Sequence, residues 1–366
     1  MQTELVNFWH NHRMRALLFL LLTTALAAQS IQKSNTTENL RGISVLANGV
    51  AWTSGTHGTY LRTVDGGNSW HVAQVPNAAA LDFRDVEAFS ADLAYLLSAG
   101  PGDQSRIYKT TDAGKTWTLQ FTNKNPKGFF DCMAFWDRDR GIALGDPVAD
   151  NAGTLRLELI STEDGGKTWN PLPRESIPPA IEGEGAFAAS GTCITVQGTA
   201  NVWFATGGKA ARVFRSTNAG KTWTVAETPI THGQDSTGIF SIAFRDAMHG
   251  VIAGGDYKHP DQDGPNLAFS NDGGVTWTLS PVSPQKYFSA VAFAKPHSDS
   301  NGIVIVGSSR SAYEDDITKR PGQKRSSQKT SQKTWDWNMN AVSVGPSGKI
   351  IAVGPKGLIV NVPPAR

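Results

Sequence analysis

Tyrosines and acidic residues are the side chains of this sequence best suited to catalysis, and their natural chemistry is the cleavage of a glycosidic bond. Glu182 and Glu184 lie two residues apart, and Tyr257 and Tyr287 lie near segments that read as loops. Two carboxyl groups can serve as the acid and the base or nucleophile of such a hydrolysis. Solvated loop residues have the same composition, so the pattern alone does not establish catalysis.

A sialidase-like glycoside hydrolase needs more than a carboxyl pair. Its chemistry requires three converging arginines, a Tyr–Glu nucleophile pair and an acid/base Asp, and the early Arg-Ile-Pro motif of such enzymes is missing here. We keep this activity as the alternative function and assign no catalytic residue.

A metal site is a second possibility, in a segment that contains Asp256, His259, Asp261 and Asp263. Their oxygens would suit calcium, but the spacing is not that of an EF-hand loop. The segment therefore predicts a polar turn, and we expect neither a metal nor a cofactor.

The most prominent feature of the sequence is a repeated box, Ser/Thr-x-Asp/Asn-x-Gly-x-Thr/Ser-Trp. An Asp or Asn at the third position caps a turn through backbone amides, Gly supplies positive φ, and Trp begins the outgoing strand. Each box therefore predicts a hairpin between two antiparallel strands, so its residues are structural. They are Asp65, Trp70, Asp112, Trp117, Asp164, Trp169, Asn218, Trp223, Asp272 and Trp277, with Trp335 ending a degraded sixth copy.

A second periodicity consists of short apolar strands that each end in glycine. There are seven, ending at Gly55, Gly100, Gly145, Gly207, Gly254, Gly307 and Gly354. Each is preceded by another β-rich run and, in the first six units, followed by a box or its remnant. Four strands in a repeating unit of about 45–55 residues are typical of a propeller blade.

These repeats predict an all-β, seven-bladed propeller of four-stranded antiparallel blades, forming one domain over residues 29–366. The blades are expected at about 40–75, 81–121, 129–173, 185–228, 237–282, 287–340 and 341–362. The last unit ends without a box and supplies only three strands. An open sheet edge is a liability, so we expect residues 30–37 to add the missing outer strand and close the ring.

Propeller geometry also predicts where a binding site would lie. The loops after the second and fourth strands of each blade share one face, and ligands favour concave sites. We expect a mixed acidic and aromatic rim on that face, formed by Asp131, Asp146, Glu184, Asp235, Tyr257 and Tyr287.

The two cysteines, Cys132 and Cys193, occupy similar places in neighbouring repeats. Packed sheets lie about 10 Å apart, beyond disulfide reach, which favours two buried thiols. Pairing in an oxidising compartment stays open.

The N-terminus resembles a secretory signal. An apolar run over residues 16–28 follows Arg13 and Arg15 and ends in small residues, which predicts a signal peptide over 1–28, from a start at Met1 or Met14, and a periplasmic or extracellular protein. The run is too short to span a bilayer comfortably, so we expect no membrane span in the mature chain. The formal charge of +2 gives no support to a nucleic-acid partner.

With these motifs in view, the boxes resemble bacterial neuraminidase repeats, and the stretch over residues 40–70 looks like the photosystem II stability/assembly factor family and its non-photosynthetic relatives. The resemblance implies a seven-bladed propeller that acts as an assembly scaffold. It also implies an arginine-rich patch across blades, whereas the arginines here, Arg84 among them, are scattered along the sequence. An oxidoreductase label carried by some relatives finds no GxGxxG, CxxC or CxxCH motif here.

We therefore expect a monomeric, exported, non-catalytic scaffold that binds a protein or complex of the cell envelope. Fold alone does not decide between this function and the glycosidase.

Overall fold

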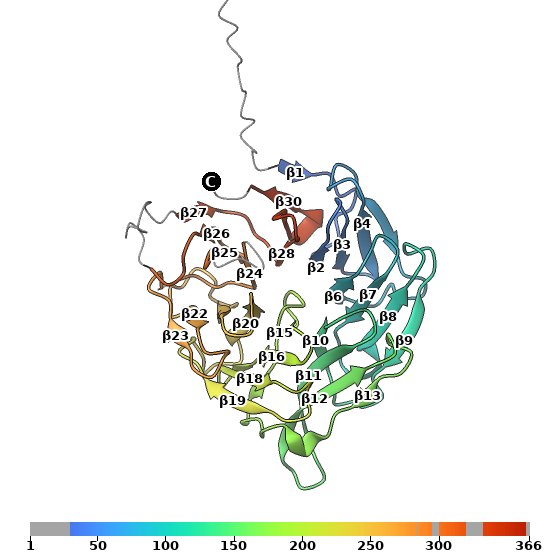
Figure 1. The fold of residues 1–366 in the computed structure, drawn as a ribbon. Helices are drawn as coiled ribbons and strands as arrows, with labels where there is room; N and C mark the ends of the chain where they lie inside the picture. Colours follow the sequence, from blue (N-terminus) through green and yellow to red (C-terminus); the bar gives the residue numbers. More distant parts are fainter. Residues whose placement is uncertain (1–29, 284, 295–299, 320–331, 364–366) are drawn as a thin grey trace, which may run out of the picture.

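The chain forms a ring of seven antiparallel sheets in the computed structural model, which describes residues 30–283, 285–294, 300–319 and 332–363. The predicted signal peptide lies outside these residues. Within them, no helix is long or apolar enough to cross a membrane. The chain passes round the ring blade by blade, and its first strand lies beside its last (Figure 1).

The first three blades follow one another with short connections. Their strands are β2 (Leu40–Val45), β3 (Ala51–Gly55), β4 (Thr59–Thr63) and β5 (His71–Gln74); β6 (Phe83–Ala88), β7 (Ala94–Ser98), β8 (Arg106–Thr110) and β9 (Thr118–Thr122); and β10 (Phe130–Phe135), β11 (Gly141–Ala149), β12 (Leu155–Thr162) and β13 (Asn170–Pro171).

The fourth blade is joined to the fifth by two short extra strands. The fourth contains β15 (Ile194–Gln197), β16 (Asn201–Ala205), β18 (Arg212–Ser216) and β19 (Thr224–Glu227), and the fifth contains β20 (Thr237–Phe244), β21 (Gly250–Asp256), β22 (Leu267–Ser270) and β23 (Thr278–Leu279). The extra strands β14 (Glu184–Gly185) and β17 (Gly207–Gly208) extend the fifth sheet inward.

The last two blades complete the ring. They contain β24 (Ala290–Phe293), β25 (Ile303–Val306), β26 (Ser311–Glu314) and β27 (Gln332–Trp335), then β28 (Ala341–Val344), β29 (Ile350–Val353) and β30 (Ile359–Val362). Three short 3-10 turns, η1 (Gly102–Gln104), η2 (Arg174–Ser176) and η3 (Pro355–Gly357), are the helical segments of the described part of the chain. The expectation of an all-β, seven-bladed propeller is therefore confirmed.

Ring closure also follows the expectation, through a shorter strand than the sequence indicated. β1 (Ser30–Gln32) pairs antiparallel with β30, with Ile31 opposite Val360. The Gln32 side chain then reaches the next blade, where its Oε1 accepts a hydrogen bond of 3.0 Å from Trp70 Nε1. The first and seventh blades are thus joined through the N-terminal segment.

The box hairpins show why the repeat has its composition. Asp65 Oδ1 accepts a hydrogen bond of 3.0 Å from the Ser69 amide, and Thr63 Oγ1 accepts one of 2.9 Å from the Gly67 amide. Gly67 adopts a φ of 86°, in the left-handed region that favours glycine. Asp112, Asp164, Asn218 and Asp272 accept the corresponding backbone bond at 2.9 Å in their own hairpins.

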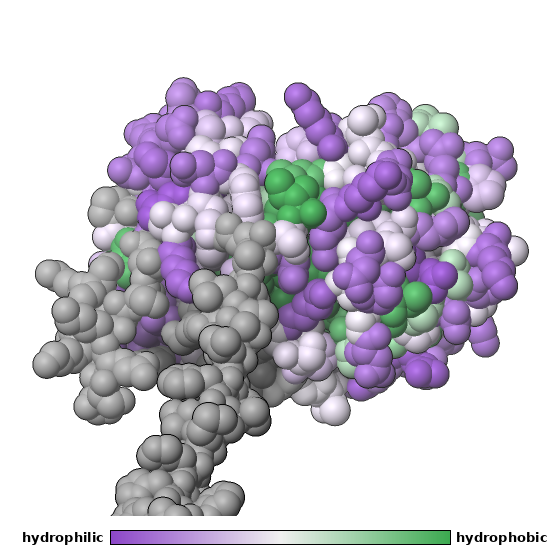
Figure 2. Space-filling model, turned by 90° about the horizontal axis from the view of Figure 1, so that it is seen from above, coloured by the Kyte–Doolittle hydropathy of each residue, from purple (hydrophilic) through white to green (hydrophobic). Residues whose placement is uncertain are grey.

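Apolar side chains fill the space between blades. In the described part of the chain, seven clusters of buried apolar residues each join two neighbouring blades, including the closing pair. The side of the ring in Figure 2 is mainly polar, with apolar side chains in separate groups. The blades are therefore held by interfaces repeated around the ring, which fixes where their inner strands meet.

The two cysteines form a disulfide, which corrects the preference for free thiols. Cys132 lies in β10 and Cys193 lies directly before β15, with their Cα atoms 6.1 Å apart. The spacing of about 10 Å applies to sheets packed face to face. Blades are wedges whose inner strands converge on the axis, so residues there come within disulfide reach.

Candidate functional site

A cavity of about 460 Å³ opens at the centre of the face formed by the loops after the second and fourth strands. Every blade, or the loop leading into it, contributes to its wall. The lining residues are Arg41, Arg84, Phe129, Asp131, Asp146, Ala186, Phe187, Ala188, Ala189, Phe240, Tyr257, Tyr287, Ser289 and Asn340. Its volume lies within the range of about 300–1,000 Å³ that is usual for ligand pockets.

β-bulges in the innermost strands position four of these side chains. Pairing with the second strand shifts register between Leu40 and Ile43, Phe83 and Asp85, Phe130 and Cys132, and Ile239 and Ser241. Bulges leave a residue outside the regular pairing and redirect its side chain. The redirected residues line the cavity: Arg41, Arg84, Asp131 and Phe240.

The equivalent sequence position also lines the cavity in the sixth and seventh blades. Ser289 and Asn340 each follow a buried apolar residue, Phe288 and Met339, directly before an inner strand. One recurrent position therefore presents one side chain from each of six blades, and two of the six are arginines.

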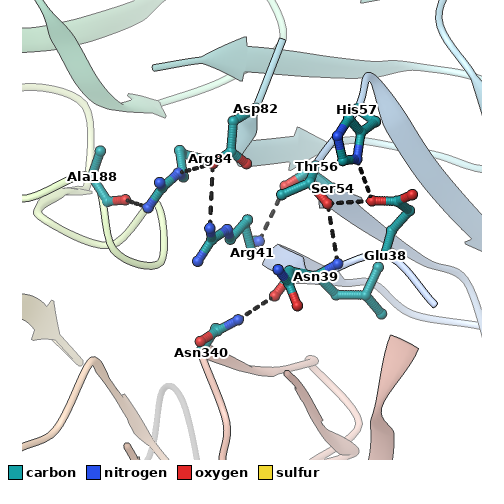
Figure 3. Close-up of polar contacts among 12 residues, drawn as sticks. Glu38, Asn39, Arg41, Ser54, Thr56, His57, Asp82, Arg84, Ala188 and Asn340 are labelled. Atoms are coloured by element: carbon teal, nitrogen blue, oxygen red, sulfur yellow. Dashed lines mark hydrogen bonds and ion pairs between the residues drawn. The ribbon is translucent and has the colours of Figure 1, made fainter. Parts of the chain in front are cut away.

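The side of the cavity formed by the first two blades is basic. Asp82 Oδ2 accepts a hydrogen bond of 2.7 Å from Arg84 Nε and one of 3.4 Å from Arg41 Nη2 (Figure 3). Arg84 Nη1 also donates to the Ala188 carbonyl at 2.8 Å. Burial, reinforced by the charge of Arg84, lowers the pKa of Arg41. One carboxylate thus holds two guanidinium groups at the cavity wall.

The third blade makes the neighbouring side acidic. Asp131 is 1% exposed, and its Oδ2 has no hydrogen-bond partner among the described residues. Burial and the charge of Asp146 raise the pKa of Asp131 well above its usual range, and Arg84 opposes them. Asp146 Oδ1 accepts a hydrogen bond of 2.9 Å from the Ala186 amide, and burial raises the pKa of Asp146 to about 6.

Aromatic rings form a third part of the wall. Phe187 and Phe240 stack with centroids 4.0 Å apart, and Tyr287 meets Phe240 edge-on at 4.9 Å. Tyr257 contacts the same pair edge-on and is 46% exposed. Burial raises the pKa of Tyr287, so this phenol stays neutral. The wall can therefore stack on a planar or cationic group.

The structure brings together four of the six predicted site residues, namely Asp131, Asp146, Tyr257 and Tyr287. Asp235 is exposed and does not line the cavity. The Glu184 side chain is fully buried and forms an ion pair with Arg212, whose Nε donates to Glu184 Oε1 at 2.9 Å. Glu184 thus anchors the loop before the fourth blade and lies away from the cavity.

Sequence reasoning missed Arg41 and the pairing of Arg41 with Arg84. The signal was present: each arginine directly follows the first buried apolar residue of its inner strand, Leu40 or Phe83. The expectation of scattered arginines is corrected for these two, because equivalent positions in consecutive blades lie side by side.

The arrangement does not complete the constellation that a sialidase-like enzyme needs. The described lining contains two arginines where that chemistry uses three, and both bind Asp82. In the candidate metal segment, His259 Nδ1 lies 2.7 Å from Asp256 Oδ2. No group of three or more His, Cys, Asp or Glu able to hold a metal occurs within the described ranges.

The opposite end of the axis has a second cavity of about 410 Å³, lined in part by Asp85 and Glu87. Asp85 Oδ2 accepts a hydrogen bond of 2.7 Å from the Met133 amide, so this carboxyl links the second and third blades. Burial raises the pKa of both groups, that of Glu87 to about 8.

Comparisons with known proteins define the fold. No family model and no curated protein matches the chain. Among solved structures, YCF48 from Cyanidioschyzon merolae is 18% identical with a TM-score of 0.61, covering 92% of this chain and 99% of its own. A structure described as YCF48 bound to D1 peptide is 16% identical with a TM-score of 0.62, covering 91% and 94%.

WD40 propellers are similar as well. The RRP9 WD40 repeats are 12% identical with a TM-score of 0.58, over 93% of this chain and 98% of that one. At these identities the likeness establishes the propeller architecture, and function must be argued from the site.

Proposed function

We propose that this chain is an exported, non-catalytic scaffold that binds a segment of an envelope protein or complex in its central cavity. The observation that carries the proposal is the cavity itself. Side chains from around the whole ring converge there, and basic, acidic and aromatic groups occupy separate parts of its wall. Such a wall suits a segment with several kinds of side chain better than it suits a single small reaction centre.

Two further observations support the proposal. A similarly folded protein, YCF48, has a structure described as bound to a D1 peptide. The disulfide between Cys132 and Cys193 is of the kind that persists in oxidising compartments, in agreement with an N-terminal export signal.

Peptide display tests the binding site. A library of random ten-residue peptides is selected on the immobilised full chain, and the affinities of selected peptides are measured for Tyr257→Ala and Val275→Ala. Val275 is 55% exposed on a box hairpin of the opposite face and serves as the matched control. We expect Tyr257→Ala to weaken binding about tenfold, since a large aromatic contact is lost, and Val275→Ala to leave it unchanged. Selected peptides that bind both variants like the wild type would refute a central site.

Export is tested separately by expression of the full-length chain in a Gram-negative host. We expect the protein in the periplasm or medium with an N-terminus near residue 28 or 29. Recovery of the uncleaved chain in the cytoplasm would contradict export and leave the binding proposal standing.

Glycoside hydrolysis remains the second candidate, because Asp131 and Asp146 share the cavity with two arginines. A fluorogenic sialoside is the appropriate substrate. We expect no turnover above background. Turnover that Asp131→Asn abolishes would replace the scaffold proposal with an enzymatic one.

A further inference from the structure

One oxygen of the Asp131 carboxyl, Oδ2, lacks the partner that its burial calls for, while the Ala188 backbone serves the carboxyl's other oxygen. The residue is 1% exposed, and its Oδ2 is without a hydrogen bond in the part of the chain that the structure describes. A buried carboxyl oxygen without a donor is costly, and ionised it would cost far more. Because the bulge at Asp131 directs this side chain to the cavity, a bound molecule can supply the missing donor.

The cationic side chains around the cavity are paired elsewhere, so Asp131 and Asp146 have no cationic partner among the described residues. Arg84 uses Nε on Asp82 and Nη1 on the Ala188 carbonyl, and Arg41 also pairs with Asp82. Neither Asp131 nor Asp146 forms an ion pair with a described residue. The mutual repulsion of these two carboxyls outweighs the influence of Arg84 on Asp131.

The aromatic part of the cavity wall, which adjoins Asp146 through Ala186 and Phe187, is suited to an organic cation. Phe187, Phe240 and Tyr257 form a connected aromatic surface, of which Tyr257 is the exposed member. Ammonium and guanidinium groups are attracted to aromatic faces, and the stems of Lys and Arg bury well against apolar surface. A hard metal ion would instead require six or more oxygen ligands, which this wall does not offer.

We propose that the acidic and aromatic side of the central cavity accepts a positively charged Lys or Arg side chain from the bound segment, with Asp131 and Asp146 as its partners. The inference rests on the proposed function and specifies the chemistry of the segment. The partner is thereby expected to present a basic residue, flanked by residues that reach the rim.

The first test is the consensus of the peptides selected on the wild-type chain. We expect a Lys or Arg at one fixed position. Replacement of that residue by the uncharged norleucine or citrulline should weaken binding about thirtyfold, since removal of one member of a buried charge pair costs that much or more.

A double-mutant cycle locates the contact. Asp131→Asn removes the charge without changing the size of the side chain, so folding should be preserved. We expect this variant to bind the basic peptide about thirtyfold more weakly and to distinguish poorly between the basic and uncharged peptides. Asp103→Asn, an exposed acidic residue on the same face, is the matched control and should bind like the wild type.

Proton linkage gives an independent readout. Asp146 from β11 and Arg84 from β6 act on Asp131, Asp82 pairs with Arg84, and Arg41 from β2 and Tyr287 before β24 share the cavity. A bound cation stabilises ionised carboxylates, so binding should release protons near neutral pH, and affinity should rise between about pH 5 and pH 7. Calorimetry in two buffers of different ionisation enthalpy measures the release, which Asp131→Asn should reduce.

The outcomes separate the two proposals. Cavity-dependent peptides anchored by acidic or neutral residues would overturn the inference and leave the scaffold proposal intact, as would equal weakening of the basic and uncharged peptides by Asp131→Asn. Failure to select any peptide sensitive to Tyr257→Ala would overturn both.

Discussion

Removal of the disulfide between Cys132 and Cys193 should lower the free energy of unfolding substantially. The cross-link closes a loop with a sequence separation of 61 residues, and loop-closure entropy of this length is worth about 4 kcal/mol at 25 °C. Both sulfurs are fully buried in the cluster between the third and fourth blades, so truncation to alanine also removes packing.

Comparison of single and double variants separates these two contributions. Cys132→Ala and Cys193→Ala each remove one sulfur atom and the cross-link. The double variant removes both sulfur atoms, but the cross-link is lost only once. We expect each single variant to lose about 5 kcal/mol and the double variant only about 1 kcal/mol more, because the cross-link is lost once, so the losses are strongly non-additive. Guanidinium chloride unfolding followed by tryptophan fluorescence measures the losses, with m-values checked for two-state behaviour.

Two results would refute this reasoning. Additive losses of about 1 kcal/mol per cysteine would mean that packing alone is responsible. An unchanged unfolding midpoint after reduction of the wild type in denaturant and refolding with the thiols blocked would show that the cross-link adds no stability.

Three other perturbations have defined outcomes. Arg212→Ala should lower the free energy of unfolding by about 3–5 kcal/mol, measured by chemical denaturation, since Glu184 then stays buried without a cation. Arg212→Ala combined with Glu184→Gln should recover part of this loss. Equal stabilities of the single and the double variant would contradict the importance of the ion pair. The pKa of Glu87 is raised to about 8 in the folded state, so between about pH 5 and pH 8 the folded chain holds a proton that the unfolded chain has released. The free energy of unfolding of the wild type should therefore fall as the pH rises from about 5 to 8, relative to that of Glu87→Gln. Parallel pH profiles would contradict this assignment. Deletion of residues 1–37 removes β1 and leaves β30 as an open edge, so light scattering should detect more association than for the intact chain.

The regular part of the fold is predictable because it is repeated. Box composition and glycine-ended strands recur in each unit, so a local rule becomes a global one once the units stack. Closure was predictable for a related reason: the seventh unit lacks a fourth strand, and the N-terminal segment is the available complement.

The site was only partly predictable because its chemistry depends on departures from regularity. A bulge inserts one residue into a strand and changes the direction of its side chain, and the alternation within a single strand does not reveal it. Arg41 and Arg84 are linked in sequence only by their equivalent positions in consecutive repeats, although both flank Asp82 in space. Glu184 was assigned to the rim because its partner Arg212 follows 28 residues later, beyond any local pattern.

Recruitment of one side chain per blade has an evolutionary consequence. The residue after the first apolar position of an inner strand contributes to the cavity wall, whereas the neighbouring apolar residue belongs to an inter-blade core. Substitution of the cavity residue can alter ligand preference, while the neighbouring apolar residue, left unchanged, preserves folding. Propellers of this architecture can thus diversify their specificity rapidly at a handful of positions, much as an antibody varies its loops on a constant framework.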